Sequence, residues 1–196
     1  MPIPIVLASS SPYRRQLLER LGVPFEAVAP KVDETPLAGE TARQMALRLA
    51  QQKADAVAMR FPQAIVIGSD QVAEMDGRKL GKPGGHEAAL QQLLAMQGRT
   101  VVFHTALSVL RYVGQRVSAD CVDTWVHFRT LPVEALEQYL LRDRPYDCAG
   151  SAKIEALGIC LVESVRSDDP TALIGLPLIR LTTMLADCGV ALPADF

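Results

Sequence analysis

Apolar residues occur along the chain in runs that alternate between strand-like and helix-like spacing. Short continuous apolar runs at 3–8 and 64–69 predict buried strands, the second ending at Asp70. Two longer runs joined at Gly114 predict a long strand pair. The predicted strands are residues 3–8, 25–29, 64–69, 100–112, 115–129 and 157–165.

Helical spacing and local end signals predict five helices between these strands, at residues 12–21, 41–59, 87–96, 133–141 and 177–187. Ser11 before Pro12 is a helix start, Gly22 a stop, and Thr41 a cap for the long second helix. Asp76-Gly77 predicts a hairpin turn. The order predicts an α/β fold with a mixed sheet flanked by helices, in one domain over residues 1–196.

The composition excludes several classes of protein. In 196 residues, 49% are hydrophobic and 21% charged, which is typical of a globular domain, and the net charge of −2 argues against a general nucleic-acid binder. No run approaches the roughly 20 apolar residues of a membrane span, and the N-terminus lacks a basic start, so we expect no membrane partner. Four separated cysteines without a C-x-x-C motif favour a reduced, cytoplasmic protein. The three histidines show no metal-ligand spacing.

The segment Ser9-Ser10-Ser11-Pro12-Tyr13-Arg14-Arg15 is a candidate anion site. It lies between a predicted strand and a helix start, where free N–H groups and the helix dipole favour negative charge. A plain capped helix with solvated arginines is the alternative.

Two charged residues occupy predicted buried positions. Asp70 follows a buried strand, where open α/β sheets place ligand groups, although a turn-forming aspartate gives the same pattern. Lys53 falls in the apolar stripe of the second helix, four residues after Leu49. It either meets a buried partner or extends its ammonium to solvent.

Weaker signals come from loops and strands. Gly81-Lys82-Pro83 is an ordinary loop by itself, and the pair Asp33-Glu34 is either a divalent-cation ligand or solvated surface. His104 and His127 lie in strand-like runs and favour structural roles, and Trp125 alternates like a packing residue.

Taken together, these residues resemble the Maf-like nucleoside triphosphate pyrophosphatases nearly from end to end. The matching segments are Ala8-Ser9-Ser10-Ser11-Pro12-Tyr13-Arg14-Arg15, Val32-Asp33-Glu34, Gln52-Lys53-Ala54, Gly68-Ser69-Asp70, Gly81-Lys82-Pro83, Phe128-Arg129, Ala149-Gly150 and Gly175-Leu176-Pro177-Leu178. The resemblance implies two lobes around a central cleft, similar to inosine triphosphate pyrophosphatases. It also implies hydrolysis of a nucleoside triphosphate to a monophosphate and pyrophosphate with a divalent cation, Mg²⁺ or Mn²⁺, and a homodimer as an expectation.

The resemblance also assigns roles to residues of this chain. It makes Asp70 the proton acceptor, Glu34 the metal ligand, and Tyr13, Gln71 and Glu155 the substrate-specificity residues. The positions that it assigns to phosphate binding are Ser9, Arg14, Lys53 and Lys82.

Three departures from the commoner family pattern indicate the substrate. Tyr13, Gln71 and Glu155 stand where most members have Arg, Thr and Gln, a combination similar to the subfamily that hydrolyses 7-methyl-GTP. N7-methylation makes guanine cationic, so an aromatic face attracts it, and a carboxylate can accept hydrogen bonds from its N1–H and N2–H₂ edge. Cys148 and Lys153 also depart from the common pattern, near Glu155.

Two other functions fit the sequence. One is a house-cleaning pyrophosphatase for dTTP, UTP or other modified nucleotides. The other is a non-catalytic nucleotide-binding regulator of septum formation, against which the intact set of charged residues argues.

Overall fold

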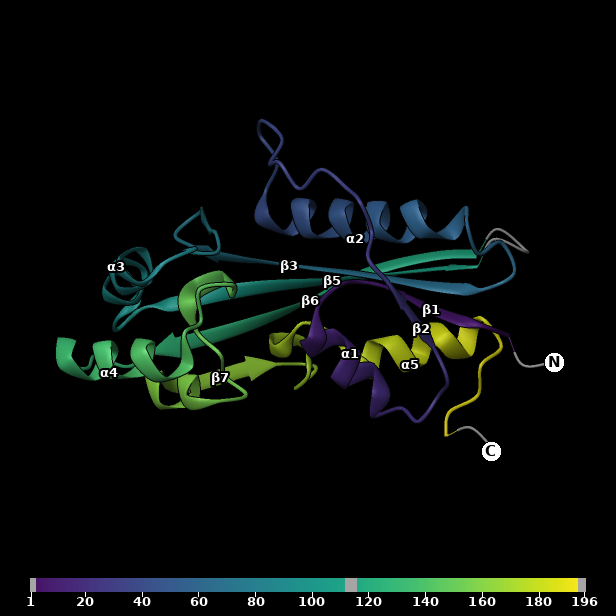
Figure 1. Ribbon diagram of the computed structural model, residues 1–196. Helices are drawn as coiled ribbons and strands as arrows, with labels where there is room; N and C mark the ends of the chain where they lie inside the picture. The colour runs from purple at the N-terminus through teal and green to yellow at the C-terminus, as the bar shows by residue number, and fades with distance from the viewer. Residues whose placement is uncertain (1–2, 112–115, 194–196) are drawn as a thin grey trace.

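The computed structural model describes residues 3–111 and 116–193 of the chain (Figure 1). The strands are β1 (Ile5–Ala8), β2 (Glu26–Val28), β3 (Ile65–Met75), β4 (Arg78–Leu80), β5 (Thr100–Arg111), β6 (Arg116–Phe128) and β7 (Val162–Ser167). The helices are α1 (Pro12–Glu19), α2 (Ala42–Ala58), α3 (His86–Met96), α4 (Val133–Asp143) and α5 (Leu178–Asp187). Three short 3₁₀ segments are η1 (Ala149–Ser151), η2 (Leu157–Leu161) and η3 (Ala172–Ile174). The predicted junction at Gly114 lies outside the described residues.

All seven strands belong to one sheet, in the order β2-β1-β3-β5-β6-β7, with β4 paired to β3. β1 pairs in parallel with β2 and β3, and the other pairings are antiparallel. The predicted mixed α/β fold is therefore confirmed. Within the described ranges, no helix has the length and apolar character needed to cross a membrane.

Two large apolar cores lie along one face of the long strands, and two smaller ones lie beneath α2 on the other face. Ile67 of β3 and Leu107 of β5 pack with β1, α1 and α5, whereas Ala73 and Phe103 of the same two strands pack with α3 and α4. Figure 1 shows α2 on one face of the sheet and α1 and α5 on the other. In the same view, α3 and α4 lie at the end of the long strands that is away from α1 and α5. The same strands thus carry a packed body at each end.

The strand predicted to end at Asp70 continues to Met75, so that prediction is wrong. β5 is hydrogen-bonded to β3 from Ile65 to Glu74, and this pairing keeps the chain extended through the polar residues. Asp70 therefore lies in the middle of a strand and not at its end.

The strand predicted over 157–165 begins only at Val162 and continues to Ser167. Leu157 and Ile159 are 40% and 54% exposed in the preceding 3₁₀ segment, so their apolar character did not indicate burial. Gly158 lies against the backbone of Lys153, where a Cβ would stand 2.4 Å from the Lys153 carbonyl oxygen. This tight turn replaces the first part of the predicted strand.

The local end signals are confirmed. Ser11 Oγ accepts a hydrogen bond from the Arg14 N–H at the start of α1, and Thr41 forms a capping box with Gln44 at the start of α2. Asp76 and Gly77 have φ values of 49° and 75° in the two-residue turn between β3 and β4. These signals predict the element ends correctly because each depends only on residues that are neighbours in the sequence.

A buried carboxylate holds the start of α5. Asp169 is 2% exposed. Its Oδ2 accepts the Ile179 and Arg180 N–H groups at 2.7 and 3.3 Å, and its Oδ1 accepts the N–H and hydroxyl of Thr171 at 3.0 and 2.7 Å. This carboxylate therefore ties the segment that carries η3 to the N-terminus of α5.

Replacing Asp169 by alanine is expected to lower the free energy of unfolding by about 3 kcal/mol, because it removes charge-assisted hydrogen bonds and a favourable helix-dipole contact. Urea denaturation followed by circular dichroism measures the change. Asp168→Ala is the matched control, because Asp168 is exposed. Equal stability of the two variants would contradict the role of Asp169.

Candidate active site

The cleft lies where one edge of β3 passes from one partner strand to another. β1 pairs with β3 as far as Gly68, and β4 begins to pair with it at Ala73. Between these pairings, Asp70 and Gln71 line a cavity of about 680 Å³. All nine candidates from the sequence line this cavity: Ser9, Tyr13, Arg14, Glu34, Lys53, Asp70, Gln71, Lys82 and Glu155. The fold thus gathers side chains from distant segments, while their roles remain predictions.

Lys53 of α2 joins two carboxylates in the cleft. Its Nζ lies 2.6 Å from Asp70 Oδ1 and 2.6 Å from Glu34 Oε1. Lys53 and Asp70 are only 6% and 7% exposed, whereas the Glu34 side chain is 52% exposed. The inward interpretation of Lys53 is therefore confirmed, and the alternative in which its ammonium extends to solvent is wrong.

The two carboxylates differ in their affinity for a proton. Burial raises the pKa of Asp70, and the charges of Lys53 and Arg14 offset this only in part. Burial also opposes ionisation of Glu34, but the hydrogen bond and charge of Lys53 outweigh it and lower the pKa of Glu34. A carboxylate with a raised pKa suits a general base, and one that stays ionised suits a cation ligand.

The turn between β1 and α1 forms the cationic part of the cleft. The buried Ser9 hydroxyl accepts the Ser11 N–H at 3.1 Å, which shapes the turn before the helix. Arg14 Nε donates to the Gly175 carbonyl at 2.9 Å, so the guanidinium is held in place from a distant segment. The exposed Lys82 lines the cleft just after β4.

The Arg14 guanidinium interacts electrostatically with the carboxylates of Asp70 and Glu34. Burial lowers the pKa of Arg14, and Asp70 and Glu34 act in the opposite direction. A guanidinium stays protonated even when its pKa is lowered, so Arg14 contributes a fixed positive charge.

Tyr13 and Glu155 lie at another part of the same cavity. The ammonium of Lys153 lies over the Tyr13 ring, 5.9 Å from its centroid, and 3.6 Å from Asp147 Oδ1. Glu155 is exposed. An aromatic face, a cation and two carboxylates therefore surround the place where a base could bind.

Gln71 points to the opposite side of β3 from Asp70. Its Nε2 lies 2.9 Å from Thr105 Oγ1 and 3.1 and 3.0 Å from the carbonyl oxygens of Ala172 and Leu173. Three acceptors around one nitrogen fix the orientation of the amide. A ligand in the cleft would therefore meet the Gln71 carbonyl oxygen.

Comparison with known proteins places these residues in a family. The sequence profile described as "Maf-like protein" matches residues 4–188. The chain belongs to the Maf-like protein family.

Relatives of this Maf-like protein are similar over nearly their whole length. A protein from Ralstonia nicotianae is 60% identical over 183 residues, which cover 93% of this chain and 94% of that protein. One from Paraburkholderia xenovorans is 58% identical over 194 residues, covering 97% and 95%. One from a Polaromonas species is 57% identical over 192 residues, covering 98% and 88%. All three are named 7-methyl-GTP pyrophosphatase.

Sequence reasoning missed the carbonyl groups that hold this Maf-like site in place. Gly175 O accepts hydrogen bonds from Arg14 Nε and Ser69 Oγ, and its φ of 122° is a conformation that favours glycine. The signal available in the sequence was the segment Gly175-Leu176-Pro177, whose glycine and proline are typical of a turn. It does not say which side chains the turn will hold.

Proposed function

We propose that this Maf-like protein hydrolyses 7-methyl-GTP to 7-methyl-GMP and pyrophosphate. The observation that carries the proposal is that Tyr13 and Glu155 line the same cavity as Asp70, Lys53 and Glu34. One cavity thus offers an aromatic face and an acid for a cationic purine, and charged groups for a triphosphate. The names of the relatives from Ralstonia, Paraburkholderia and Polaromonas support the same substrate.

The proposed mechanism assigns charge neutralisation to the cationic side chains. Arg14, Lys53 and Lys82 bind the triphosphate oxygens, and the Ser9 hydroxyl donates to them. Asp70 accepts a proton from a water molecule, which attacks in line at one phosphorus of the α–β bridge. The P–O bond of the α–β bridge breaks, and the products are the nucleoside monophosphate and pyrophosphate, whose charge the same cations balance. The raised pKa of Asp70 supports its assignment as the base.

The donor set in the cleft fits a hard divalent cation. Carboxylate oxygens of Glu34 and Asp70 converge on one position, which Lys53 Nζ occupies at 2.6 Å from each oxygen. Oxygen ligands are those that Mg²⁺ and Mn²⁺ prefer, and we propose that Glu34 holds this ion. When bound, such an ion neutralises phosphate charge.

One observation favours a second candidate, a pyrophosphatase for an uncharged base such as that of dTTP or UTP. Lys153 already places an ammonium 5.9 Å from the Tyr13 ring centroid, and this charge would repel a cationic base. Asp147 and Glu155 oppose that repulsion, since both carboxylates line the cavity.

Measuring pyrophosphate release from 7-methyl-GTP, GTP, dTTP and UTP, with and without Mg²⁺ or Mn²⁺, tests the proposal. We expect the highest kcat/KM with 7-methyl-GTP and a metal. Glu155→Gln should lower the ratio of kcat/KM for 7-methyl-GTP to that for GTP about fivefold, because an exposed charge contributes up to about 1 kcal/mol.

Glu163→Gln, a change at an exposed residue of β7, is the matched control and should leave the ratio unchanged. A preference for the pyrimidine nucleotides would support the second candidate. Tight nucleotide binding without pyrophosphate release would instead favour the non-catalytic regulator.

A further inference from the structure

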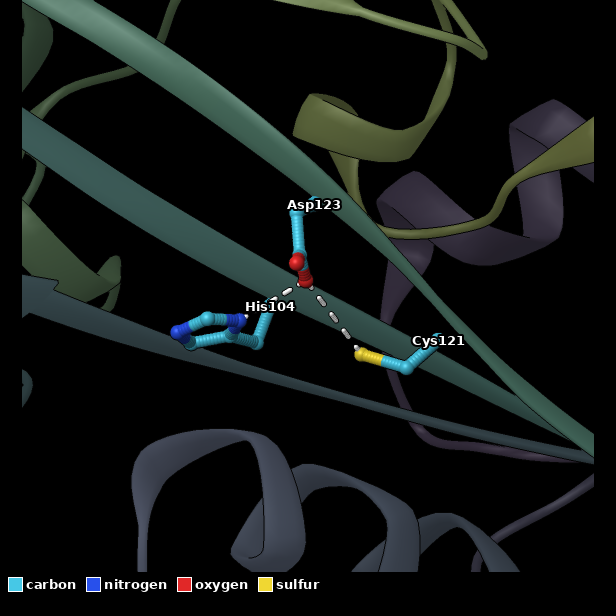
Figure 2. A group of neighbouring side chains, drawn as sticks. All are labelled: His104, Cys121 and Asp123. Atoms are coloured by element: carbon cyan, nitrogen blue, oxygen red, sulfur yellow. Dashed lines mark hydrogen bonds and ion pairs between the residues drawn. The ribbon is translucent and has the colours of Figure 1, made fainter.

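A second group of ligand-type side chains lies on the face of the sheet that carries Asp70. His104 of β5 is directly opposite Asp123 of β6, and Cys121 precedes Asp123 by two residues, so all three point to one face (Figure 2). His104 Nδ1 is 2.8 Å and Cys121 Sγ 3.8 Å from Asp123 Oδ1. One ligand atom from each residue lies within 4.8 Å of the others.

This group is separate from the phosphate-binding part of the cleft. Asp70, Ala106 and Cys121 occupy one row across β3, β5 and β6, so Cys121 is two strand spacings, about 10 Å, from Asp70. Cys121 and Asp123 line a different cavity, of about 500 Å³, which His104 does not line.

The three donor types select a particular class of metal. Imidazole, thiolate and carboxylate together are typical of zinc, whose tetrahedral sites often keep a fourth position open for water. Mg²⁺ prefers oxygen ligands and is disfavoured here by the sulfur. The group therefore suits a different ion from the one proposed at Glu34.

A carboxylate lies near each ring nitrogen of His104. Glu74 Oε2 lies 4.0 Å from the other ring nitrogen, Nε2. This distance is longer than a hydrogen bond, so the Glu74 carboxylate acts on the imidazole through its charge alone. In the metal-free state Asp123 can only accept, so His104 Nδ1 carries the hydrogen that lies between them.

The Asp123 carboxylate already binds a cation. Arg43 Nη1 of α2 lies 2.6 Å from the same Oδ1 atom, and Arg43 Nη2 donates to the Cys121 carbonyl at 2.9 Å. The Arg43 side chain is 43% exposed, so it can move into solvent without unpacking α2. A divalent ion would take its place against the carboxylate.

We propose that His104, Cys121 and Asp123 form a binding site for a zinc-type divalent cation, and that Arg43 occupies the carboxylate when the metal is absent. Without metal, the Cys121 thiol carries its proton and donates weakly to Asp123 Oδ1 at 3.8 Å. On binding, the metal–sulfur bond replaces the S–H bond and this proton passes to solvent. The hydrogen on His104 Nδ1 is lost or transferred to Nε2, which faces Glu74.

The test is a titration of the metal-free full-length protein with Zn²⁺ against a chromophoric chelator, together with the absorption spectrum of the Co²⁺ form. We expect one tight site per chain and a thiolate-to-Co²⁺ charge-transfer band. Cys121→Ser should abolish the band and weaken Zn²⁺ binding at least about tenfold. Cys160→Ser, a change at an exposed cysteine, is the matched control and should do neither.

Three further variants test whether the metal binds at these residues or in the cleft. Asp123→Asn, at a carboxylate only 23% exposed, should also weaken binding, which keeps the test valid if Cys121→Ser does not fold. Arg43→Met should strengthen Zn²⁺ binding several-fold, because it removes the competing charge. Glu34→Gln should leave the Zn²⁺ stoichiometry unchanged.

The proposal is overturned if Cys121→Ser and Cys160→Ser bind Zn²⁺ equally, or if Arg43→Met binds it no more tightly than the unmodified protein. Loss of binding in Glu34→Gln alone would assign the metal to the cleft.

Discussion

Replacing Asp70 by asparagine is expected to lower kcat for pyrophosphate release about 10²- to 10⁴-fold, the usual contribution of a general base. The amide has nearly the shape of the carboxyl group but cannot accept a proton from water. Steady-state release of pyrophosphate from the nucleotide that the unmodified protein hydrolyses fastest measures the effect. Because binding of the nucleotide depends mainly on other residues, KM should change much less than kcat.

The Asp70→Asn variant should fold. Burial raises the pKa of Asp70, so its ionised form is held at a cost, and Lys53 keeps Glu34 as a partner at 2.6 Å. Asp55→Asn, at an exposed position on the same helix as Lys53, is the matched control and should retain full turnover. Near-normal turnover by a folded Asp70→Asn variant would remove Asp70 from the mechanism.

Replacing Gly68 by alanine is expected to lower the free energy of unfolding by about 3 kcal/mol or more, because it overpacks a site bounded by main chain. A Cβ at this position would lie 2.1 Å from Ala50 O and 2.8 Å from Ala54 N, both backbone atoms of α2. The whole helix would have to move away from β3. Urea denaturation measures the loss, and turnover should fall as well because Lys53 lies between the two contact positions.

Gly81→Ala is the matched control for the stability measurement. Apart from its two chain neighbours, no atom of residues 3–111 and 116–193 lies within 4 Å of the Cβ position at Gly81, so this variant should be as stable as the unmodified protein. If Gly68→Ala matches the stability of Gly81→Ala, α2 does not lie against β3 as closely as described.

Much of the fold could be predicted because its signals are local. Ser11, Thr41 and the Asp76-Gly77 turn each act within a few residues, and the structure has an element boundary at each. The extension of β3 beyond Asp70 could not be predicted, since it depends on pairing with β5, where the partner residues lie 28 to 34 positions away in the chain. Exposed Leu157 and Ile159 had the same apolar signal as core residues.

The candidate site could not be predicted from local signals alone. Taken one at a time, Asp70, Lys53 and Glu34 also fitted non-functional roles in a turn or at the surface. Only the order and spacing of many motifs, compared with a known family, assigned them to one site. Burial of Lys53 against two carboxylates then follows from the close contact of α2 with Gly68. The group around Cys121 had no signal in the spacing of the sequence, because the register of β5 and β6 creates it.

The two large apolar cores share β3 and β5, and these shared strands limit how the protein can capture a nucleotide. β3 and β5 run without interruption from one core to the other, with β3 hydrogen-bonded to β5 from Ile65 to Glu74, and β6 pairs with β5 in turn. A hinge between the two bodies would have to bend several ladders of hydrogen bonds at once. The continuous strands therefore fix the two packed bodies relative to each other. We expect selectivity to come from side chains already in position, and not from closure of the cleft around the substrate.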